Sequence, residues 1–267
     1  MSYESMSVSE RRLLPPAVAV STVAFALRPP EGAQVGPVSP VQSSQTATLW
    51  LPLVRRTRPP FAGRWALPGG PIPWDETLVD TALRTLRAAA QRDPGYLEQL
   101  YSFGAVERSA EAQRLVTIAY WALYGEADLT RSRADSLGVG VGNDGTDQSD
   151  PAPEADPNVA WFSADVLPEL AFDHGEIVAH ALDRLRSKTG YSTVAYRFLG
   201  ESFTLAQLRE VREAILGETI DPANFRRQTL GQGHLVDTGH LTSGDRHRPA
   251  RLYRFNDHLS NAPRSTT

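Results

Sequence analysis

Residues 69–92 read Gly-Gly-Pro-Ile-Pro-Trp-Asp-Glu-Thr-Leu-Val-Asp-Thr-Ala-Leu-Arg-Thr-Leu-Arg-Ala-Ala-Ala-Gln-Arg and join a glycine-rich turn to an amphipathic helix. Asp75 is the expected N-cap, and Glu76 suits the positive end of the helix dipole. Apolar residues recur at helical spacing and form one face: Leu78, Val79, Ala82, Leu83 and Leu86. A glycine-rich turn before a helix can hold a phosphate on its backbone amides.

Three apolar stretches around this helix have the composition of buried strands, and they span residues 17–27, 47–54 and 115–124. The proline-rich segment 29–46 has no apolar periodicity, so we expect a loop that joins the first two strands into a long hairpin. Strands around a helix in this order predict an α+β domain over residues 13–170.

The approach to the helix, Gly63-Arg-Trp-Ala-Leu-Pro-Gly-Gly70, resembles the start of a Nudix box. That signature is Gly, five residues, Glu, seven residues, Arg-Glu, a hydrophobic residue, any residue, Glu-Glu, any residue, Gly and a hydrophobic residue. Four of its positions match, namely Gly70, Glu76, Arg84 and Leu86. The others depart from it, since they hold Thr85, Ala88, Ala89, Gln91 and Arg92.

The departures remove the carboxylates of the box. Positions 85, 88 and 89 share one helix face, and Nudix hydrolases use glutamates there to hold magnesium and activate water. Here the face is Thr85, Ala88 and Ala89. We therefore expect a Nudix-like fold without metal-dependent hydrolysis, and so a protein that is not an enzyme and has no metal site. An ordinary amphipathic helix after a glycine turn is the plainer alternative.

A connecting helix is expected over residues 171–190. Asp173 and Glu176 have nearly the spacing of a capping box. His174 reads as structural, because a catalytic base needs an oriented partner and no candidate can be named. Residues 191–199 form a short apolar helix candidate.

Two helix starts follow in the C-terminal part of the chain. Thr204 and Gln207 have the spacing of a capping box, and Gly217 closes that helix. Asp221 before Pro222 places an N-cap and a first-turn proline at the start of the second. Two short helices joined by a tight turn predict a helix-turn-helix, although a helical hairpin with a solvated basic face has the same pattern.

The next segment favours DNA binding over the plainer alternative. Residues 234–237 and 250–255 read as strands around the loop 238–249, and a hairpin after a helix-turn-helix is a wing. Six arginines lie within residues 221–256, and such clustering suits the neutralisation of phosphates. Residues 187–267 carry 11 Lys and Arg against 8 Asp and Glu, whereas the rest of the chain carries 16 against 23.

Particular roles follow from side-chain chemistry. Asn224 suits bidentate contact with adenine. Arg226 and Arg227 point to different faces, so at most one of them is expected to read a base and the other to bind phosphate. Thr204 at a helix N-terminus is a phosphate contact, and Arg248 reaches the minor groove or the backbone. The candidate DNA contacts are Thr204, Asn224, Arg226, Arg227, Arg246, Arg248 and Arg251.

Taken together, residues 15–256 resemble the Nudix-related transcriptional regulators, the NrtR family. The resemblance implies a Nudix-like α/β/α sandwich over 13–170, a connecting helix over 171–190 and a winged helix-turn-helix over 191–257. The acidic segment 125–157 is long for the family, and its composition predicts a flexible insertion. It implies a homodimeric repressor of NAD biosynthesis or salvage genes on palindromic operator DNA, with ADP-ribose or a related NAD metabolite as effector. The implied effector-binding residues are Arg56, Trp65, Gly69, Gly70 and Glu76.

Two alternatives stay open. The first is a Nudix-type ADP-ribose or nucleoside-diphosphate pyrophosphatase with an accessory winged helix, whose carboxylates come from Glu98, Glu107 or Glu111. The second is a metabolite-binding module whose winged helix contacts proteins. The operator sequence, the regulated genes and the sign of the effector's action are not determined by the sequence.

Composition limits the other classes. The chain has 267 residues, of which 41% are hydrophobic and 22% charged, so it can bury a core. The absence of cysteine excludes disulfides and thiolate zinc sites. The sequence has neither a run of about 18 apolar residues nor a secretory signal, and no cofactor is required by any motif. We therefore expect a cytoplasmic protein without a membrane partner.

Overall fold

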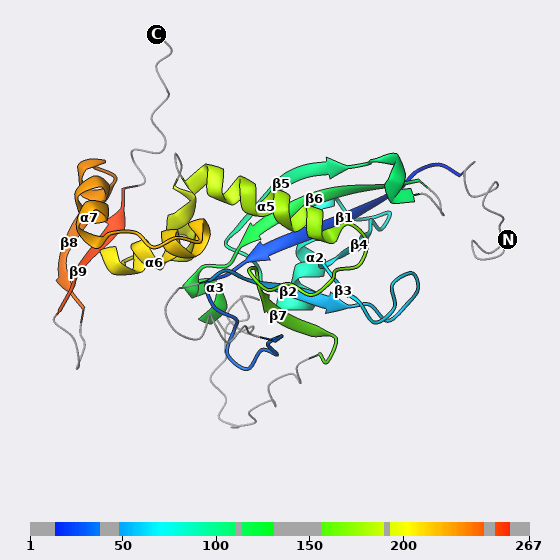
Figure 1. Cartoon of the computed structure of the whole chain (residues 1–267), viewed down its shortest axis with the longest axis horizontal. Coiled ribbons are helices and arrows are strands. Elements are labelled where there is room, and N and C mark those ends of the chain that lie inside the picture. The colour runs from blue at the N-terminus through cyan, green and yellow to red at the C-terminus, as the bar shows by residue number, and fades with distance from the viewer. Residues whose placement is uncertain are drawn as a thin grey trace, which may run out of the picture.

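The computed structural model describes residues 14–37, 48–109, 114–130, 156–189, 193–242 and 249–256. The N-terminal part is built on two sheets, and the C-terminal part on two helices and a hairpin (Figure 1). Helix α5, His174–Thr189, lies along the first part and leads to the second. Within the described ranges, no helix is long and apolar enough to cross a membrane.

The N-terminal part contains a mixed sheet and an antiparallel sheet. The mixed sheet has the strand order β4-β1-β6-β5, in which β1 and β6 run parallel, and the antiparallel sheet has the order β3-β2-β7. The strands are β1 Ala17–Phe25, β2 Trp50–Arg55, β3 Trp65–Ala66, β4 Gly69–Pro71, β5 Tyr96–Phe103, β6 Leu115–Leu123 and β7 Val159–Ser163. A 3₁₀ turn η3, Val106–Ser109, follows β5, and a short helix α3, Glu126–Thr130, follows β6.

The expected hairpin between residues 17–27 and 47–54 is wrong. β1 pairs with β4 and β6, whereas β2 pairs with β3 and β7, and the two strands meet through the isolated bridge Ala26–Trp50. The physical reason is that β1 is apolar on both faces. A strand of this kind is stable in the centre of a sheet that is covered on both sides.

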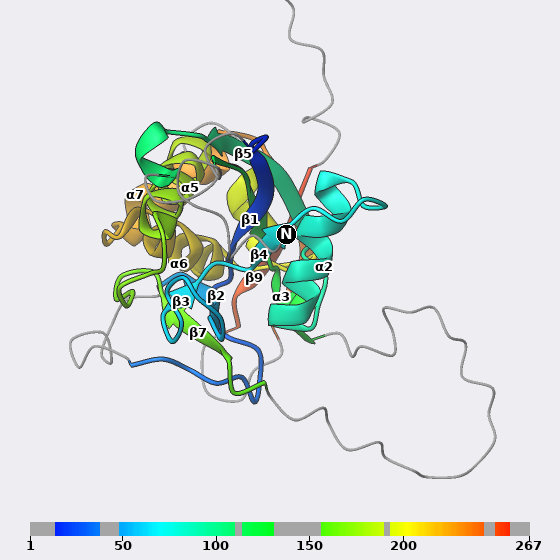
Figure 2. The same ribbon diagram turned by 90° about the vertical axis from the view of Figure 1, so that its right-hand side faces the viewer.

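Helices α2, Leu78–Ala90, and α5 cover opposite sides of the sheets (Figure 2). Alternate residues of β1 follow this division. Ala24 packs in a cluster with Leu86 of α2, and Phe25 packs in the cluster that contains Ile177 of α5. The result is the Nudix-like sandwich that the sequence predicts.

The start and the buried face of α2 differ from the sequence prediction. The N-cap is Thr77 rather than Asp75, because Thr77 and Asp80 form a reciprocal capping box. Val79 is exposed, and the buried residues are Thr81, Ala82, Thr85, Leu86, Ala89 and Ala90. Small side chains on this face let the helix lie close to the sheet.

The C-terminal part is a winged helix. It comprises η4 Val194–Phe198, α6 Leu205–Leu216, α7 Pro222–Gly231, β8 Leu235–Leu241 and β9 Arg251–Phe255. The predicted caps are confirmed, since Thr204 and Gln207 form a capping box and Asp221 accepts a hydrogen bond from the backbone N–H of Asn224. Gly217 ends α6 with a φ of 73°, a conformation that favours glycine.

The wing extends further than the sequence indicates. β8 continues to Leu241, so the expected loop start at residue 238 is wrong, and a register shift lies between Asp237 and Leu241. Phe203 and Tyr253 exchange two backbone hydrogen bonds of 2.9 and 2.8 Å, which joins β9 to the start of α6. The hairpin is therefore fixed to the helices rather than free.

Candidate effector site and nucleic-acid interface

The Nudix-box positions of α2 hold no carboxylate. Thr85 is buried, and its hydroxyl donates to the carbonyl oxygens of Thr81 and Ala82 at 2.9 and 3.0 Å. Ala89 is also buried, whereas Ala88 is exposed. The three positions therefore do not share one open face. No group of three His, Cys, Asp or Glu side chains suited to a metal occurs among the described residues.

Glu76 is held in an ion pair on the surface of α2. Arg84 Nε donates to its Oε1 at 2.6 Å, and the Thr81 hydroxyl donates to its Oε2 at 2.8 Å. The hydrogen bond from Arg84 lowers the pKa of the Glu76 carboxyl. Glu76 and Arg84 both match the box, and here their ion pair ties the segment before α2 to the helix.

The glycine pair lies in strand β4 and not in a turn, so that part of the sequence prediction is wrong. Gly69 and Gly70 pair with Ser21 and Val20 of β1. A Cβ on Gly69 would stand 2.2 Å from the backbone oxygen of Val20, whereas a Cβ on Gly70 would meet no atom within 4 Å. Glycine is needed at position 69 because two strands approach closely there.

A glycine-to-alanine pair tests this close approach. We expect Gly69→Ala to lower the free energy of unfolding by about 1–3 kcal/mol through overpacking. Gly70→Ala, its neighbour in the same strand, is expected to change it by less than about 0.5 kcal/mol. Thermal unfolding of both variants measures the difference, and equal melting temperatures would contradict the steric explanation.

Arg56 and Trp65 lie near the link between the sheets and α5. Arg56 Nε donates to the carbonyl oxygen of Pro60 at 2.7 Å, and its guanidinium stands 4.7 Å from the Phe172 ring centroid. Burial lowers the pKa of Arg56. Trp65 is half-buried and packs edge-on against Phe162. Both residues support the fold here.

His174 connects the same region to the first turn of α5. The backbone N–H of Leu67 donates to His174 Nδ1 at 2.9 Å, and the imidazole is buried. Burial lowers the pKa of His174 to about 4. A neutral ring that accepts a backbone hydrogen bond is a structural histidine, in agreement with the sequence analysis.

The low pKa predicts acid sensitivity. The unfolded chain binds a proton on this residue near its ordinary pKa of about 6.5, and the folded protein does so only near 4. The stabilisation that the neutral His174 provides is therefore complete above about pH 6.5, and it is lost as the pH falls toward 4. Near pH 4 this lowers the free energy of unfolding by about 3 kcal/mol.

Comparison of His174→Gln with the wild type over pH 4–7 measures this contribution. The glutamine carbonyl can accept the Leu67 hydrogen bond but does not titrate, so its stability is expected to fall less steeply with acid. His180→Gln on the exposed side of α5 is the matched control. Parallel curves for wild type and His174→Gln would contradict the assignment.

The exposed face of α7 carries the predicted base-reading residues. Arg226, Arg227 and Asn224 are exposed, whereas Phe225 between them is buried in the core. Arg227 Nη2 donates to Asn224 Oδ1 at 2.8 Å, so these two side chains orient each other. Arg226 has no hydrogen bond or ion pair with another described residue and points from a different part of the helix surface.

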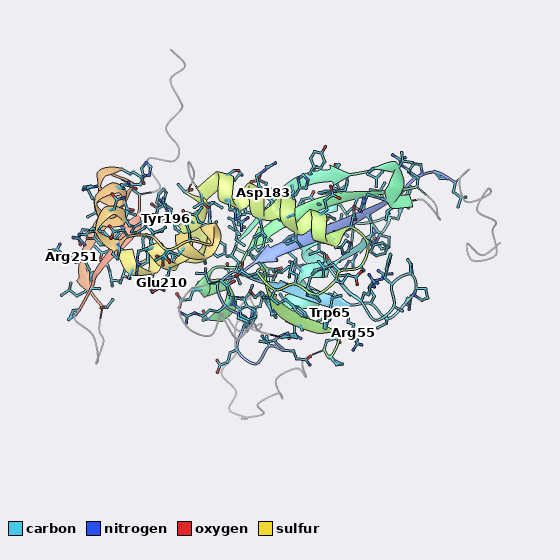
Figure 3. All side chains as sticks on the ribbon, viewed as in Figure 1. Arg55, Trp65, Asp183, Tyr196, Glu210 and Arg251 are labelled. Carbon is cyan, nitrogen blue, oxygen red and sulfur yellow. The ribbon has the colours of Figure 1, made fainter. Side chains whose placement is uncertain are left out.

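The wing adds two exposed arginines. Arg251 pairs with Asp237 across the hairpin at 2.5 Å, and it lies at the end of the molecule farthest from the sheets (Figure 3). Arg254 is exposed, and no ion pair joins it to a described residue; sequence reasoning placed it on the strand but left it out of the DNA contacts. Arg246 and Arg248 lie outside the described residues.

Thr204, another predicted DNA contact, is the N-cap of α6. It is 8% exposed, and its hydroxyl oxygen accepts the Gln207 backbone N–H at 3.2 Å as part of the capping box. The capping interaction already uses the hydroxyl group that was expected to contact phosphate. The exposed arginines of the described winged helix that are available as a basic surface are Arg226 and Arg227 on α7 with Arg251 and Arg254 on β9, and Asn224 lies beside Arg227.

This combination defines a class of protein: a Nudix-like domain with an altered box, joined through a long helix to a winged helix with a basic face. Residues 195–255 match the model of the NrtR DNA-binding winged helix domain. The chain is 31% identical over 222 residues to the ADPR responsive transcriptional repressor NtrR of Acinetobacter baylyi, and the match covers 81% of this chain and 80% of that protein. The chain belongs to the NrtR family.

Solved structures agree with this assignment. NrtR of Shewanella oneidensis, crystallised with a 27mer DNA, is 31% identical with a TM-score of 0.63, and the match covers 90% of this chain and 93% of that one. A MutT/nudix family protein from Enterococcus faecalis is 23% identical with a TM-score of 0.59, and the match covers 95% and 96% of the two chains. The second likeness shows the fold alone.

Proposed function

We propose that this protein is a transcriptional repressor that binds double-stranded operator DNA through α7 and the wing. ADP-ribose or a related NAD metabolite is its effector, the operator is palindromic, and a homodimer binds it. The regulated genes are those of NAD biosynthesis or salvage. The Acinetobacter relative is named as an ADPR responsive repressor, and the Shewanella relative was crystallised with DNA, which supports this proposal.

The observation that carries the proposal is the exposed basic face of the winged helix. Arg226 on α7 and Arg254 on β9 are not engaged by any described carboxylate, so their charges are available to phosphates. Asn224 and Arg227 form a hydrogen-bonded pair near the start of α7, where a recognition helix reaches base edges.

The proposed link between effector and DNA runs through α5. At one end of this helix, His174 accepts a hydrogen bond from Leu67 of the Nudix-like part. Near the other end, Arg186 Nε donates to the carbonyl oxygen of Ile215 in α6 at 3.1 Å. An effector alters DNA affinity only if it binds two arrangements of these parts unequally, and a coupling of about 1–3 kcal/mol gives a 5–150-fold effect.

Two ion pairs hold the C-terminal end of α5, the end that also contacts α6, on the sheet. Glu98 of β5 pairs with Lys188, and with Arg184 at 3.3 Å. Partial burial raises the pKa of the Glu98 carboxyl. Hydrogen bonds from Lys188 and Tyr96 outweigh this effect, and the pKa is lowered overall. We therefore infer that α5 moves with the Nudix-like part and that the change of arrangement occurs between α5 and the winged helix.

The protein is proposed to lack hydrolase activity. The alternative pyrophosphatase needs carboxylates outside the box, and Glu98 was its first candidate. Glu98 of β5 pairs with Arg184 and Lys188 of α5. Helix α5 lies on the opposite side of the sheets from α2 (Figure 2). The side chains of Glu107 and Glu111 lie outside the described part of the structure. Incubation with ADP-ribose and magnesium is expected to yield no AMP, and AMP formation that EDTA abolishes would establish the alternative.

Fluorescence anisotropy tests DNA binding itself. Labelled promoter DNA from NAD biosynthesis genes is titrated with protein at several salt concentrations, beside a scrambled duplex of equal length. We expect preferential binding to the promoter, with an affinity that falls steeply with salt. Absence of binding to every duplex at low salt would favour a winged helix that contacts proteins instead.

A further inference from the structure

A buried carboxylate holds the turn between the two helices of the winged helix. Glu213 lies near the end of α6 and is 9% exposed. Its Oε1 accepts two hydrogen bonds, one from the backbone N–H of Ile220 at 2.8 Å and one from Arg209 Nη1 at 3.2 Å. Glutamate is rarely buried unless it is paired, so these contacts account for its position.

Arg209 holds the same turn residue from the other side of its peptide unit. Arg209 lies one helical turn before Glu213 on α6, and its Nη1 also donates to the carbonyl oxygen of Ile220 at 3.3 Å. The backbone N–H and the carbonyl group of Ile220 are therefore both bound by side chains of α6. Ile220 directly precedes Asp221, the N-cap of α7. The ion pair thus fixes the chain at the point where α7 begins.

The rest of α7 is held along a narrow line. The buried residues of this ten-residue helix are Phe225 and Thr229, which lie one turn apart. Phe225 packs in the core, and the Arg212 guanidinium stands 5.7 Å from its ring centroid. A helix held along one line can roll about that line. The contact at the start of α7 therefore contributes strongly to its orientation.

Orientation matters because the predicted base-reading residues lie at this end of α7. Asn224 is four residues beyond Ile220, and its Oδ1 accepts the hydrogen bond from Arg227. Contacts with base edges need side chains held within about 0.5 Å and 10–20° of the productive geometry. Phosphate contacts carry no sequence information and depend mainly on charge. A misdirected α7 should therefore lose sequence preference before it loses general DNA affinity.

We propose that Glu213 is a positioning residue for DNA recognition, which sets the direction in which α7 presents Asn224 and Arg227 to the bases. Glu213 acts through the Ile220 backbone, together with Arg209. The inference rests on the proposed function, in which α7 enters operator DNA. As a buried anion Glu213 does not bind phosphate itself, so its effect on DNA is entirely indirect.

Two substitutions separate the reach of this side chain from its charge. Glu213→Gln keeps the length of the side chain and an oxygen that can accept the Ile220 N–H, but it removes the charge. Glu213→Asp keeps the charge and withdraws the carboxylate by one methylene group. Glu210→Asp is the matched control, since Glu210 is exposed one residue after Arg209 and is labelled on α6 in Figure 3.

Anisotropy titrations of the full chain with labelled promoter DNA and with a scrambled duplex measure the effect. We expect Glu213→Asp to lower the ratio of promoter to scrambled affinity by about 5–150-fold, as the loss of one bidentate base contact predicts. Its affinity for the scrambled duplex should change less than about twofold. Glu213→Gln should keep most of the ratio, and Glu210→Asp all of it. Circular dichroism sets a titration temperature at which every variant is folded.

Two results would overturn the inference and leave the proposed function intact. One is a Glu213→Asp variant that weakens both duplexes equally, because Glu213 would then support the fold without directing α7. The other is loss of the ratio in Glu213→Gln but not in Glu213→Asp, because charge rather than reach would then matter. A wild-type protein without preference between the duplexes would remove the proposed function, and this inference with it.

Discussion

Replacement of Arg226 and Arg254 by alanine together is expected to lower operator affinity about 100–10,000-fold near 0.15 M salt. Both side chains are exposed on the winged helix, one on α7 and one on β9, and neither is paired with a described carboxylate. Each lost charged hydrogen bond to phosphate removes about 1.5–3 kcal/mol, and about 1.4 kcal/mol corresponds to a tenfold change. The two residues do not contact each other, so their effects should nearly add.

The salt dependence distinguishes phosphate contacts from other losses. Removal of two phosphate contacts should reduce the slope of log affinity against log salt by about 1.8. Arg58→Ala, an exposed arginine of the Nudix-like part, is the control and should change neither affinity nor slope. A double variant that binds with the wild-type slope would show that these arginines do not face DNA.

The second large effect is expected at the buried ion pair between Arg108 and Asp173. Arg108 Nη2 donates to Asp173 Oδ1 at 2.8 Å and to the Thr117 hydroxyl at 3.0 Å, and its Nη1 donates to the carbonyl oxygen of Phe103. The Arg108 side chain is 8% exposed. Asp173→Ala leaves this buried cation without its counter-charge, so we expect a loss of about 3–5 kcal/mol in the free energy of unfolding.

Chemical denaturation of two further variants checks the cause. Asp183→Ala lies on the same helix, where its side chain is 79% exposed and pairs with Arg186 at 3.9 Å, and it should cost less than about 1 kcal/mol. Arg108→Met combined with Asp173→Ala should be less destabilised than Asp173→Ala alone, because no unpaired charge is left. If the double variant is worse than the single one, burial of the charge is not the cause.

The winged helix was predictable because its determinants are local in the sequence. Thr204 with Gln207, and Asp221 with Pro222, specify helix starts within four residues, and both caps form as predicted. The apolar strands 17–27 and 115–124 were likewise evident from composition, and they form β1 and β6. Local hydrogen bonding and burial of apolar runs need no knowledge of the partner segments.

The pairing of strands and the close approach of backbones could not be predicted, because their determinants are far apart in the sequence. No pattern within residues 17–54 indicates that β1 pairs in parallel with β6, which begins about 90 residues after β1 ends. The requirement for glycine at position 69 comes from the Val20 carbonyl, and the role of Asp173 comes from Arg108.

The central claim is that one molecule binds both operator DNA and a nucleotide effector, and that each affects the other. The most direct test is anisotropy of labelled promoter DNA from NAD biosynthesis genes, titrated with the full chain with and without saturating ADP-ribose. We expect salt-sensitive binding whose dissociation constant changes by about 5–150-fold with ADP-ribose. Tight binding of ADP-ribose together with an unchanged DNA dissociation constant would contradict the account.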